Sequence, residues 1–524
     1  MFATTKPNQL MPATYSQTIP FRPVPNQPIN ACKHYREHRL ELETMDDILS
    51  RSGLDEFMLQ QALNQRKGQS EDEKSYRRGL DQFVNHVRSA FRISILRALS
   101  KLKSVREMEI SLGSDTLEQW FCFIPNFDQV ASPSKSSIDR DKRFFTGEDL
   151  QKAFQMLLQK ASSDPENYDP VLECAINAIG FQMPLNLLEV WYDGTCMASN
   201  IHFPTDWVQL GDCCRSLLKT IGTIRSHGII NRMPAGGTAN LLSALNQLLI
   251  AFGNARRRKD SRKLRKSILR DLKKFANRCD HHARRHRELL VKFRDEKTDL
   301  SKGQADLLIG NLDNILTQLP ILKKQAHDRI IGGRRIKQDE KILSVYEPNI
   351  KVILRGKSGA EVEFGNQLMI GENRDGLITY YELFDDVKND WGRLEGALDK
   401  TEYNIGKKLH LVVGDRGFSD EKTELLIEKS HPDIINHICP KSTKLHNEKR
   451  KDPEFKKSQK RRAQTEARIA IVTNNYQNGR SLSKGIESQR MELHWVMLAH
   501  NLRGIARIRL AEELARSRDR KKAA

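Results

Sequence analysis

The spacing of apolar residues predicts two long helical regions in this chain. Apolar side chains recur every three or four positions through residues 36–185, and the same pattern returns from about 206 to 339, where Gly332 and Gly333 end it. The clearest single helices are expected at 53–66, 76–103 and 147–160. With 524 residues, the chain is too long for one compact core, so several domains are expected.

Strand-like segments separate and follow these helical regions. The apolar run LNLLEVWYD has the length of a buried strand that ends at Asp193. Three β-like segments punctuated by glycine occupy 342–384, and KLHLVVGD at 408–415 and HIC at 437–439 are further strand patterns. Helical patterns alternate with them at 391–400, 419–430, 453–473 and 490–517. The alternation predicts an α/β protein with a mixed sheet.

The charge of the chain is concentrated in two runs. Lys and Arg number 87 against 67 Asp and Glu, which gives a net charge of +20. Residues 256–297 hold 18 basic and 6 acidic side chains, and residues 441–462 hold 10 and 3. A charge run is often a solvated helix face, but this excess of basic residues favours contact with the phosphates of a nucleic acid.

Several other classes of protein are disfavoured. The first 35 residues are rich in Pro, Thr, Asn and Gln without a continuous apolar stretch, so we expect a flexible leader and no export signal. The best membrane candidate, 241–255, is too short and is interrupted by Asn and Gln. Eight cysteines without a CxxC pair indicate a reducing, intracellular setting. The chain has no phosphate-binding glycine motif of a nucleotide-driven motor.

Three acidic residues are candidates for chemistry. Asp193 and Asp415 follow strand patterns, and Glu466 lies in a helical pattern four residues after Arg462, with which it can pair. Carboxylates at strand ends of α/β sheets project toward the ligand crevice. Three that converge there need cations, and a pair of Mg²⁺ or Mn²⁺ ions suits phosphodiester chemistry. Each acid alone is a weak signal, since an Asp after a strand is usually a turn or cap residue.

Five segments stand out in order along the chain: YDGTCMASNIHFPTD at 192–206, RGKSGAEVEFGNQLMI at 355–370, DRGF at 415–418, KKSQKRRAQTEARIAIVTNNY at 456–476 and HNLRGIARI at 500–508. Together they resemble blocks of bacterial insertion-sequence DDE transposases. The resemblance covers about 186–215 and 342–510. Several blocks in the right order are more specific than any single one.

The resemblance implies a ribonuclease H-like fold in which Asp193, Asp415 and Glu466 form the catalytic, metal-binding triad. It implies Mg²⁺-dependent cleavage at the inverted-repeat ends of a mobile element, strand transfer into target DNA, a homodimer on paired ends, and a prokaryotic cytoplasmic, nucleoid-associated location. Related transposases often carry a Tyr, Arg, Glu, Lys signature around the third acid. Here Arg462 and Glu466 match it, whereas Gln459 and Thr473 replace the Tyr and Lys.

The resemblance and the patterns together define an expected domain organisation. A helical N-terminal domain would serve DNA end binding or dimerisation, and a large basic helical insertion would separate the first and second aspartates and carry a DNA-contacting arm. The expected bounds are 1–35 for the leader, 36–185 for the N-terminal domain, 186–215 and 340–510 for the catalytic core, 216–339 for the insertion and 511–524 for a basic tail. The arm is expected to contact DNA through Arg256, Arg257, Arg258 and Lys259, and Arg462 to contact it from the core.

Two other functions stay open at this level. A non-catalytic DNA-binding derivative would need no triad, whereas a ribonuclease H-like nuclease without strand transfer would keep it. A zinc site at His282 and His286 is disfavoured because no Glu follows the first His and arginines surround the pair, which favours a DNA-facing or solvated helix. The role of His202, which lies near Asp193 in sequence, is left open.

Overall fold

The chain forms two compact units in the computed structural model. The first comprises residues up to Met197 together with those from Gln367 onward, and the second comprises Ala198–Asn366. The structure describes residues 22–101, 104–125, 129–169, 174–294, 299–337, 340–347, 349–357, 360–386, 388–477 and 479–523. Most of the expected leader and the last residue of the expected tail therefore lie outside the described residues. Among the described helices, none is long and apolar enough to cross a membrane.

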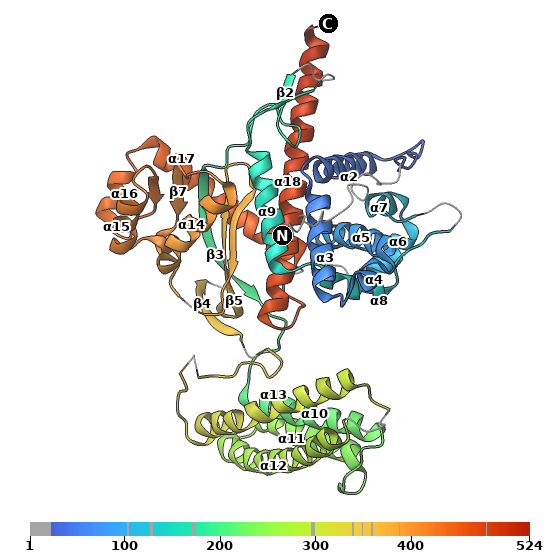
Figure 1. Ribbon diagram of the computed structural model, residues 1–524. Helices are drawn as coiled ribbons and strands as arrows, with labels where there is room; N and C mark the ends of the chain where they lie inside the picture. Colours follow the sequence, from blue (N-terminus) through green and yellow to red (C-terminus); the bar gives the residue numbers. More distant parts are fainter. Residues whose placement is uncertain are drawn as a thin grey trace, which may run out of the picture. The chain divides into compact units, whose positions relative to one another are not determined.

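Helices form the N-terminal part of the first unit, as the apolar spacing predicts (Figure 1). The helix expected at 76–103 is divided by Gly79, whose positive φ of 64° ends one helix and begins the next. Thr146 and Asp149 form a capping box that starts α9. The elements are α2 (Lys33–Arg51), α3 (Leu54–Gln69), α4 (Glu73–Arg77), α5 (Leu80–Leu99), α6 (Val105–Ser114), α7 (Thr116–Phe121), α8 (Lys135–Asp141), η1 (Lys142–Phe144) and α9 (Gly147–Ala161).

The residues just before α2 are tied to these helices. Arg22 forms an ion pair with Asp46 at 2.8 Å, and its carbonyl oxygen accepts a hydrogen bond of 3.1 Å from Trp120. Val24 packs against the core. The described part of the expected leader is therefore held in place, because a buried arginine network reaches back to it.

A mixed sheet confirms the expected α/β class. Its strands pair in the order β4 (Lys351–Lys357), β5 (Ala360–Glu372), β3 (Glu189–Ala198), β7 (Leu411–Gly414) and β8 (Ile435–Ile438), and β6 (Ile378–Leu383) also pairs with β5. β3, β7 and β8 are parallel, whereas β4 and β6 run antiparallel to β5. A separate two-stranded ribbon joins β1 (Asn167–Asp169) and β2 (Cys174–Ile176).

Helices of the C-terminal part flank this sheet, and α9 and α18 lie side by side along it (Figure 1). α18 caps the edge strand β6, because the side chain of Asn501 exchanges two hydrogen bonds with the backbone of Ile378. These elements are η3 (Asp390–Arg393), α14 (Leu394–Ile405), η4 (Arg416–Phe418), α15 (Glu421–Ser430), α16 (Thr443–Lys449), α17 (Pro453–Ala470), η5 (Ile471–Tyr476) and α18 (Ile486–Ala523).

Two adjacent residues of β3 show which helices cover which face. The Trp191 indole donates to the Ser458 carbonyl of α17 at 3.0 Å, while the Tyr192 hydroxyl donates to the Ala397 carbonyl of α14 at 3.1 Å. Successive strand residues point to opposite faces, so α17 and α14 cover opposite sides of the sheet. Asp193 then points to the same side as Trp191, the side of α17.

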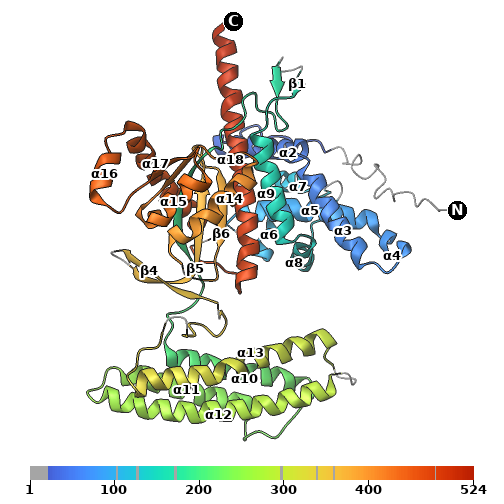
Figure 2. The same cartoon turned by 60° about the vertical axis from the view of Figure 1, so that its left-hand side comes forward.

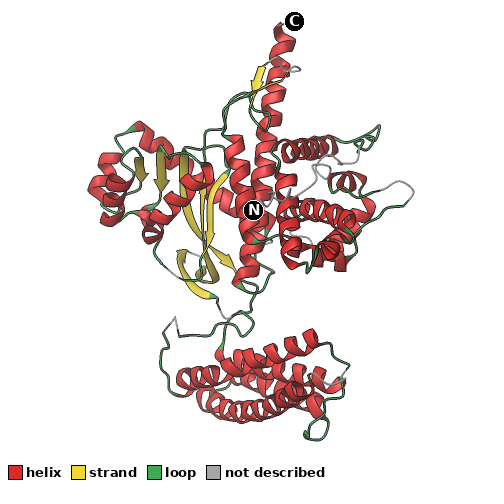
Figure 3. Ribbon diagram, in the orientation of Figure 1, coloured by secondary structure: helices red, strands yellow, loops and turns green. Residues whose placement is uncertain are grey.

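Four helices pack together in the second unit. Figure 3 shows them as a helical bundle, and Figure 2 shows the same bundle turned by 60°. α11 and α13 each pack against both α10 and α12. The members are α10 (Asp206–Ser226), α11 (Gly237–Ala255), α12 (Ser261–Phe293) and α13 (Lys302–Ala326), followed by the π-helix η2 (His327–Ile331). α10 belongs to this bundle from its first residue, so the unit begins before 216 and the expected boundary falls within a helix.

The basic run forms α12, one of the helices of this bundle. α12 buries Leu269, Leu272, Phe275, Ala276, Cys279, Ala283 and Leu290. These positions lie three or four residues apart, which is the spacing of one helix face. His286 is also fully buried, and its Nδ1 lies 2.7 Å from the carbonyl oxygen of His282. His286 therefore packs inside the bundle, while α12 keeps exposed positions on its other side.

Candidate active site

The parallel register of the sheet aligns two of the three predicted acids. Trp191 of β3 pairs with Val413 of β7, so Asp193 and Asp415 lie two residues further along neighbouring strands. The sequence predicts that Asp193 ends its strand, but β3 continues to Ala198. β7 pairs only with Glu189–Trp191 of β3. The strand continues beyond this point because β5 pairs with its other edge. Asp193 therefore lies just beyond the point where β7 stops.

Both aspartates are oriented by the backbone that follows them. Asp193 Oδ1 accepts a hydrogen bond of 2.8 Å from the amide of Gly194, and Asp415 Oδ1 accepts one of 2.7 Å from Gly417. Asp415 is the N-cap of η4, so the turn that ends β7 also holds its carboxylate. Asp193 is thus oriented within β3 by the amide of the next residue, and Asp415 by the turn that ends β7.

The pKa of Asp193 reflects the charges of the other two acids. The pKa of Asp193 is raised to about 6, first by burial and then by the negative charge of Asp415, with a further contribution from Glu466. The positive charge of Arg462 acts in the opposite direction. Asp193, Asp415 and Glu466, which we call the acidic site, therefore share one electrostatic environment with Arg462, although nothing in the chain connects them locally.

Glu466 is the most accessible member of the acidic site. Its side chain is 57% exposed, and Oε1 lies 3.5 Å from the Arg462 guanidinium one turn earlier on α17. The sequence predicts this pair. The distance is that of a loose ion pair without a hydrogen bond, so the Glu466 carboxylate is free to exchange Arg462 for another cation.

Three strands hold the helix that carries Glu466. Ser458 of α17 accepts from Trp191 of β3, and the Gln459 amide donates to the carbonyl oxygens of Gly414 at 3.2 Å and His437 at 2.6 Å. Gly414 directly precedes Asp415. The Gln that replaces the Tyr of the signature thus joins the helix of the third acid to the strand end of the second.

A buried glutamate anchors the same helix to β5. Glu372 is fully buried and pairs with Arg461 at 2.5 Å and Arg468 at 3.0 Å, while Thr465 donates to it at 2.9 Å. The Arg461 guanidinium also stacks over the Trp191 ring at 4.4 Å. Sequence reasoning did not single out Glu372, because its partners lie far away along the chain.

Sequence reasoning also missed a further carboxylate at this end of the sheet. Asp390, at the start of η3, lies against the backbone of Gly194 and Gly417, so that a Cβ at either glycine would fall about 3 Å from its oxygens. In the sequence it precedes a helical pattern, where an Asp is usually a cap. The only available signal is the pair of glycines that follow Asp193 and Asp415.

The acidic site fits a divalent cation by charge and donor type. Within the described parts of the chain, no three His, Cys, Asp or Glu side chains stand close enough to hold one ion. Burial raises the pKa of Asp193, and the negative charges of Asp415 and Glu466 raise it further, so a cation beside them would offset that repulsion. Carboxylate oxygens are the ligands that Mg²⁺ and Mn²⁺ take.

Four of the basic residues predicted to contact DNA lie in the second unit. Arg256, Arg257, Arg258 and Lys259 are all exposed and occupy the turn between α11 and α12. His202, whose role the sequence leaves open, lies with Nε2 2.8 Å from a carboxylate oxygen of Asp212 on α10. The four basic side chains therefore form a compact cationic tip on the bundle.

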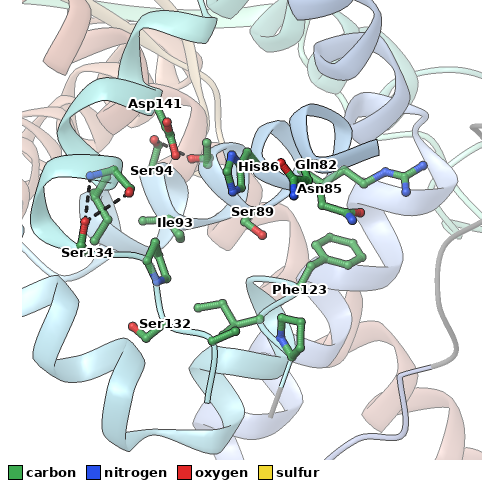
Figure 4. A pocket seen from close by; sticks show the side chains of 18 of the residues that line it. Gln82, Asn85, His86, Ser89, Ile93, Ser94, Phe123, Ser132, Ser134 and Asp141 are labelled. Carbon is green, nitrogen blue, oxygen red and sulfur yellow. Dashed lines mark hydrogen bonds between the residues drawn. The ribbon is translucent and has the colours of Figure 1, made fainter. Parts of the chain in front are cut away.

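A cavity of about 650 Å³ lies among the N-terminal helices of the first unit (Figure 4). Polar side chains of α5 line it, among them Gln82, Asn85, His86 and Ser89, together with Phe123 and part of α8. Asp141 is the single carboxylate in its described lining. The cavity thus lacks the paired acids that phosphodiester chemistry needs, and the acidic site remains the better candidate.

A comparison with protein families matches residues 429–506 to the model described as Transposase DDE domain. The matched segment contains β8, α16, α17, η5 and part of α18, and hence Arg462 and Glu466. No curated protein and no solved structure matches the chain. The chain therefore carries a segment of a transposase DDE domain near its C-terminus.

The acidic site makes a prediction for stability without metal. The pKa of Asp193 in the folded protein, about 6, exceeds its ordinary value of 3.8, so its contribution to stability is lost as the pH rises through that interval. At pH 8 in EDTA, Asp193→Asn should unfold at a higher urea concentration than the wild type. Its free energy of unfolding should be larger by about 1–3 kcal/mol. The difference should shrink toward zero at pH 4, and equal stabilities at pH 8 would contradict the burial of a charged Asp193.

Proposed function

We propose that the protein is a DNA transposase of the bacterial insertion-sequence type, with a ribonuclease H-like core in the first unit. The supporting observation is that Asp193, Asp415 and Glu466 share one environment at one end of a mixed sheet, while the segment around Glu466 matches a transposase DDE domain. The substrate is the inverted-repeat DNA at the ends of its own element, and the products are cleaved ends joined to target DNA.

In this proposal Asp193, Asp415 and Glu466 hold two Mg²⁺ or Mn²⁺ ions. Such ions polarise a phosphodiester and stabilise the attacking and leaving oxygens of an in-line displacement. The amides of Gly194 and Gly417 orient the aspartates, and α17 carries Glu466. Arg462, whose charge already acts on Asp193, would be available to contact a DNA phosphate if Glu466 held a cation.

DNA binding in this proposal relies on the basic surfaces. The cationic tip of the bundle contacts phosphates, and two copies of the chain hold the paired ends of the element. Replacing Arg256, Arg257, Arg258 and Lys259 with Ala should weaken binding to specific and random DNA alike and lower the salt slope by about 0.9 per lost phosphate contact. The matched control changes the three arginines to Lys, which keeps the charge and should keep the slope. An unchanged slope in the Ala variant would mark the tip as a solvated surface.

The decisive experiment uses the full chain, duplex DNA that carries the ends flanking its gene, a target plasmid, and Mg²⁺ or EDTA. We expect metal-dependent cleavage that leaves 3′-hydroxyl ends and products in which those ends are joined to the plasmid. Binding without cleavage would instead identify a non-catalytic derivative. Cleavage without joined products would identify a nuclease, and either result would overturn the proposal.

A further inference from the structure

We infer that Asp390 is a fourth carboxylate of the acidic site and a further ligand for the divalent cations there. The inference rests on the proposed function and extends its metal site by one residue. A Cβ built on Gly194 would lie 3.1 Å from Asp390 Oδ1, and one built on Gly417 would lie 2.9 Å from Oδ2. Asp390 therefore lies between the residue that follows Asp193 and the turn that holds Asp415.

The distance to Asp415 suits a shared cation site. The Cβ position built on Gly417 is 2.9 Å from Asp390 Oδ2 and also 2.9 Å from Asp415 Oδ1. These two oxygens therefore lie within about 6 Å of each other. Two paired ions lie about 3.5–4 Å apart, with ligand oxygens about 2 Å from each ion. Carboxylates within this distance can each bind one of two neighbouring ions.

The orientation of Asp390 is fixed by a chain of hydrogen bonds. The Gln367 amide nitrogen donates to Asp390 Oδ1 at 2.7 Å, and the Gln367 oxygen accepts from Arg393 at 2.8 and 3.1 Å. Arg393 is itself buried, paired with Asp386 at 2.7 Å and stacked over the Phe384 ring at 3.5 Å. Hydrogen bonds of this kind orient metal-binding carboxylates.

Asp390 does not have the contacts of an ordinary helix cap. It is the first residue of η3, and no side chain caps that helix. Among the described residues, no Lys, Arg or His lies within ion-pair distance of Asp390, and its hydrogen-bond donor Gln367 is neutral. Its carboxylate therefore has no direct counter-ion among the described side chains, and the charges of Asp415 and Arg393 act on it in opposite directions. The two glycines keep the space around it open, because any Cβ there would press on the carboxylate.

The test measures Mn²⁺ binding to the full chain without DNA, by calorimetry, in the wild type and in Asp390→Asn. We expect the variant to bind Mn²⁺ about 10–100-fold more weakly, while its affinity for end DNA stays unchanged. The matched control is Asp385→Asn, an exposed aspartate in the same loop that removes the same charge. It should bind Mn²⁺ as the wild type does. Equal losses in the two variants would show a general charge effect and overturn the inference.

Two further variants separate the possible failures. Asp415→Asn tests the metal site itself: if it binds Mn²⁺ as tightly as the wild type, the metal assignment of the proposed function fails. If Asp415→Asn loses binding and Asp390→Asn does not, only the inference about Asp390 fails. Gln367→Met keeps every carboxylate and removes the hydrogen bond to Asp390, so it should weaken Mn²⁺ binding less than Asp390→Asn. If Gln367→Met binds Mn²⁺ as tightly as the wild type, Gln367 does not orient Asp390. Circular dichroism is used to check that each variant is folded.

Discussion

Asp415→Asn is expected to abolish DNA cleavage while leaving the binding of end DNA almost unchanged. Asn keeps the size of the side chain and can still accept from Gly417, so the turn after β7 should survive. What is lost is the negative charge that a divalent cation needs at the end of the strand. Stabilisation worth several kcal/mol in the transition state corresponds to a rate loss of about 1,000-fold or more. Asp193→Asn and Glu466→Gln should behave alike.

The comparison that makes this result specific is Asp420→Asn. Asp420 lies five residues after Asp415 and caps α15 by accepting from Lys422. Because Asn is an equally good cap, this variant should cleave within about twofold of the wild-type rate. Cleavage is measured on labelled end DNA in Mg²⁺, and binding is measured in Ca²⁺ or EDTA. A wild-type cleavage rate in Asp415→Asn would remove Asp415 from the catalytic site.

The second large effect concerns the helix that carries Glu466. Replacing Glu372 with Ala would leave Arg461 and Arg468, which are only 13% and 25% exposed, without their carboxylate. Removing one partner of a buried ion pair costs about 3–5 kcal/mol, because the remaining charge stays buried and uncompensated. We therefore expect the urea midpoint of the first unit to fall sharply and cleavage to fall with it.

A surface pair provides the control for this prediction. Glu487 pairs with Arg490 on α18 at 2.6 Å, but its side chain is 81% exposed. Glu487→Ala should change stability by less than about 1 kcal/mol. If Glu372→Ala unfolds at the same urea concentration as Glu487→Ala, then the buried pair does not anchor α17. Other contacts would then position Glu466.

Local sequence patterns predict the elements of the first unit well, because strand and helix periods depend on neighbouring residues. The strand before Asp193, the strand before Asp415 and the helix around Glu466 are all found near their expected positions. The length of β3 was not predictable, since its continuation to Ala198 depends on β5 at its other edge. Periodicity shows that a strand exists, and pairing decides where it ends.

Contacts between distant residues escape such reasoning. Glu372 and Arg461 are separated by 89 positions, and Glu372 lies outside the blocks that carry the resemblance. Asp390 has the sequence context of a cap, and only the folded sheet brings it to Gly194 and Gly417. For α12, the dense positive charge concealed a regular apolar face whose burial requires the other three helices. The charge of a segment can be counted from the sequence, whereas the face of the helix that is buried depends on how the helices pack.

The many bonds between α17 and the sheet make the chain unequally tolerant of changes in length. Each residue added to a helix turns everything beyond it by about 100°, so an insertion between Gln459 and Glu466 would rotate the acid away while the earlier bonds hold. The turn at 256–260, which joins two helices of the bundle on its exposed side, carries no such constraint. Among natural variants of this chain, insertions and deletions should accumulate in that turn and be absent from α17.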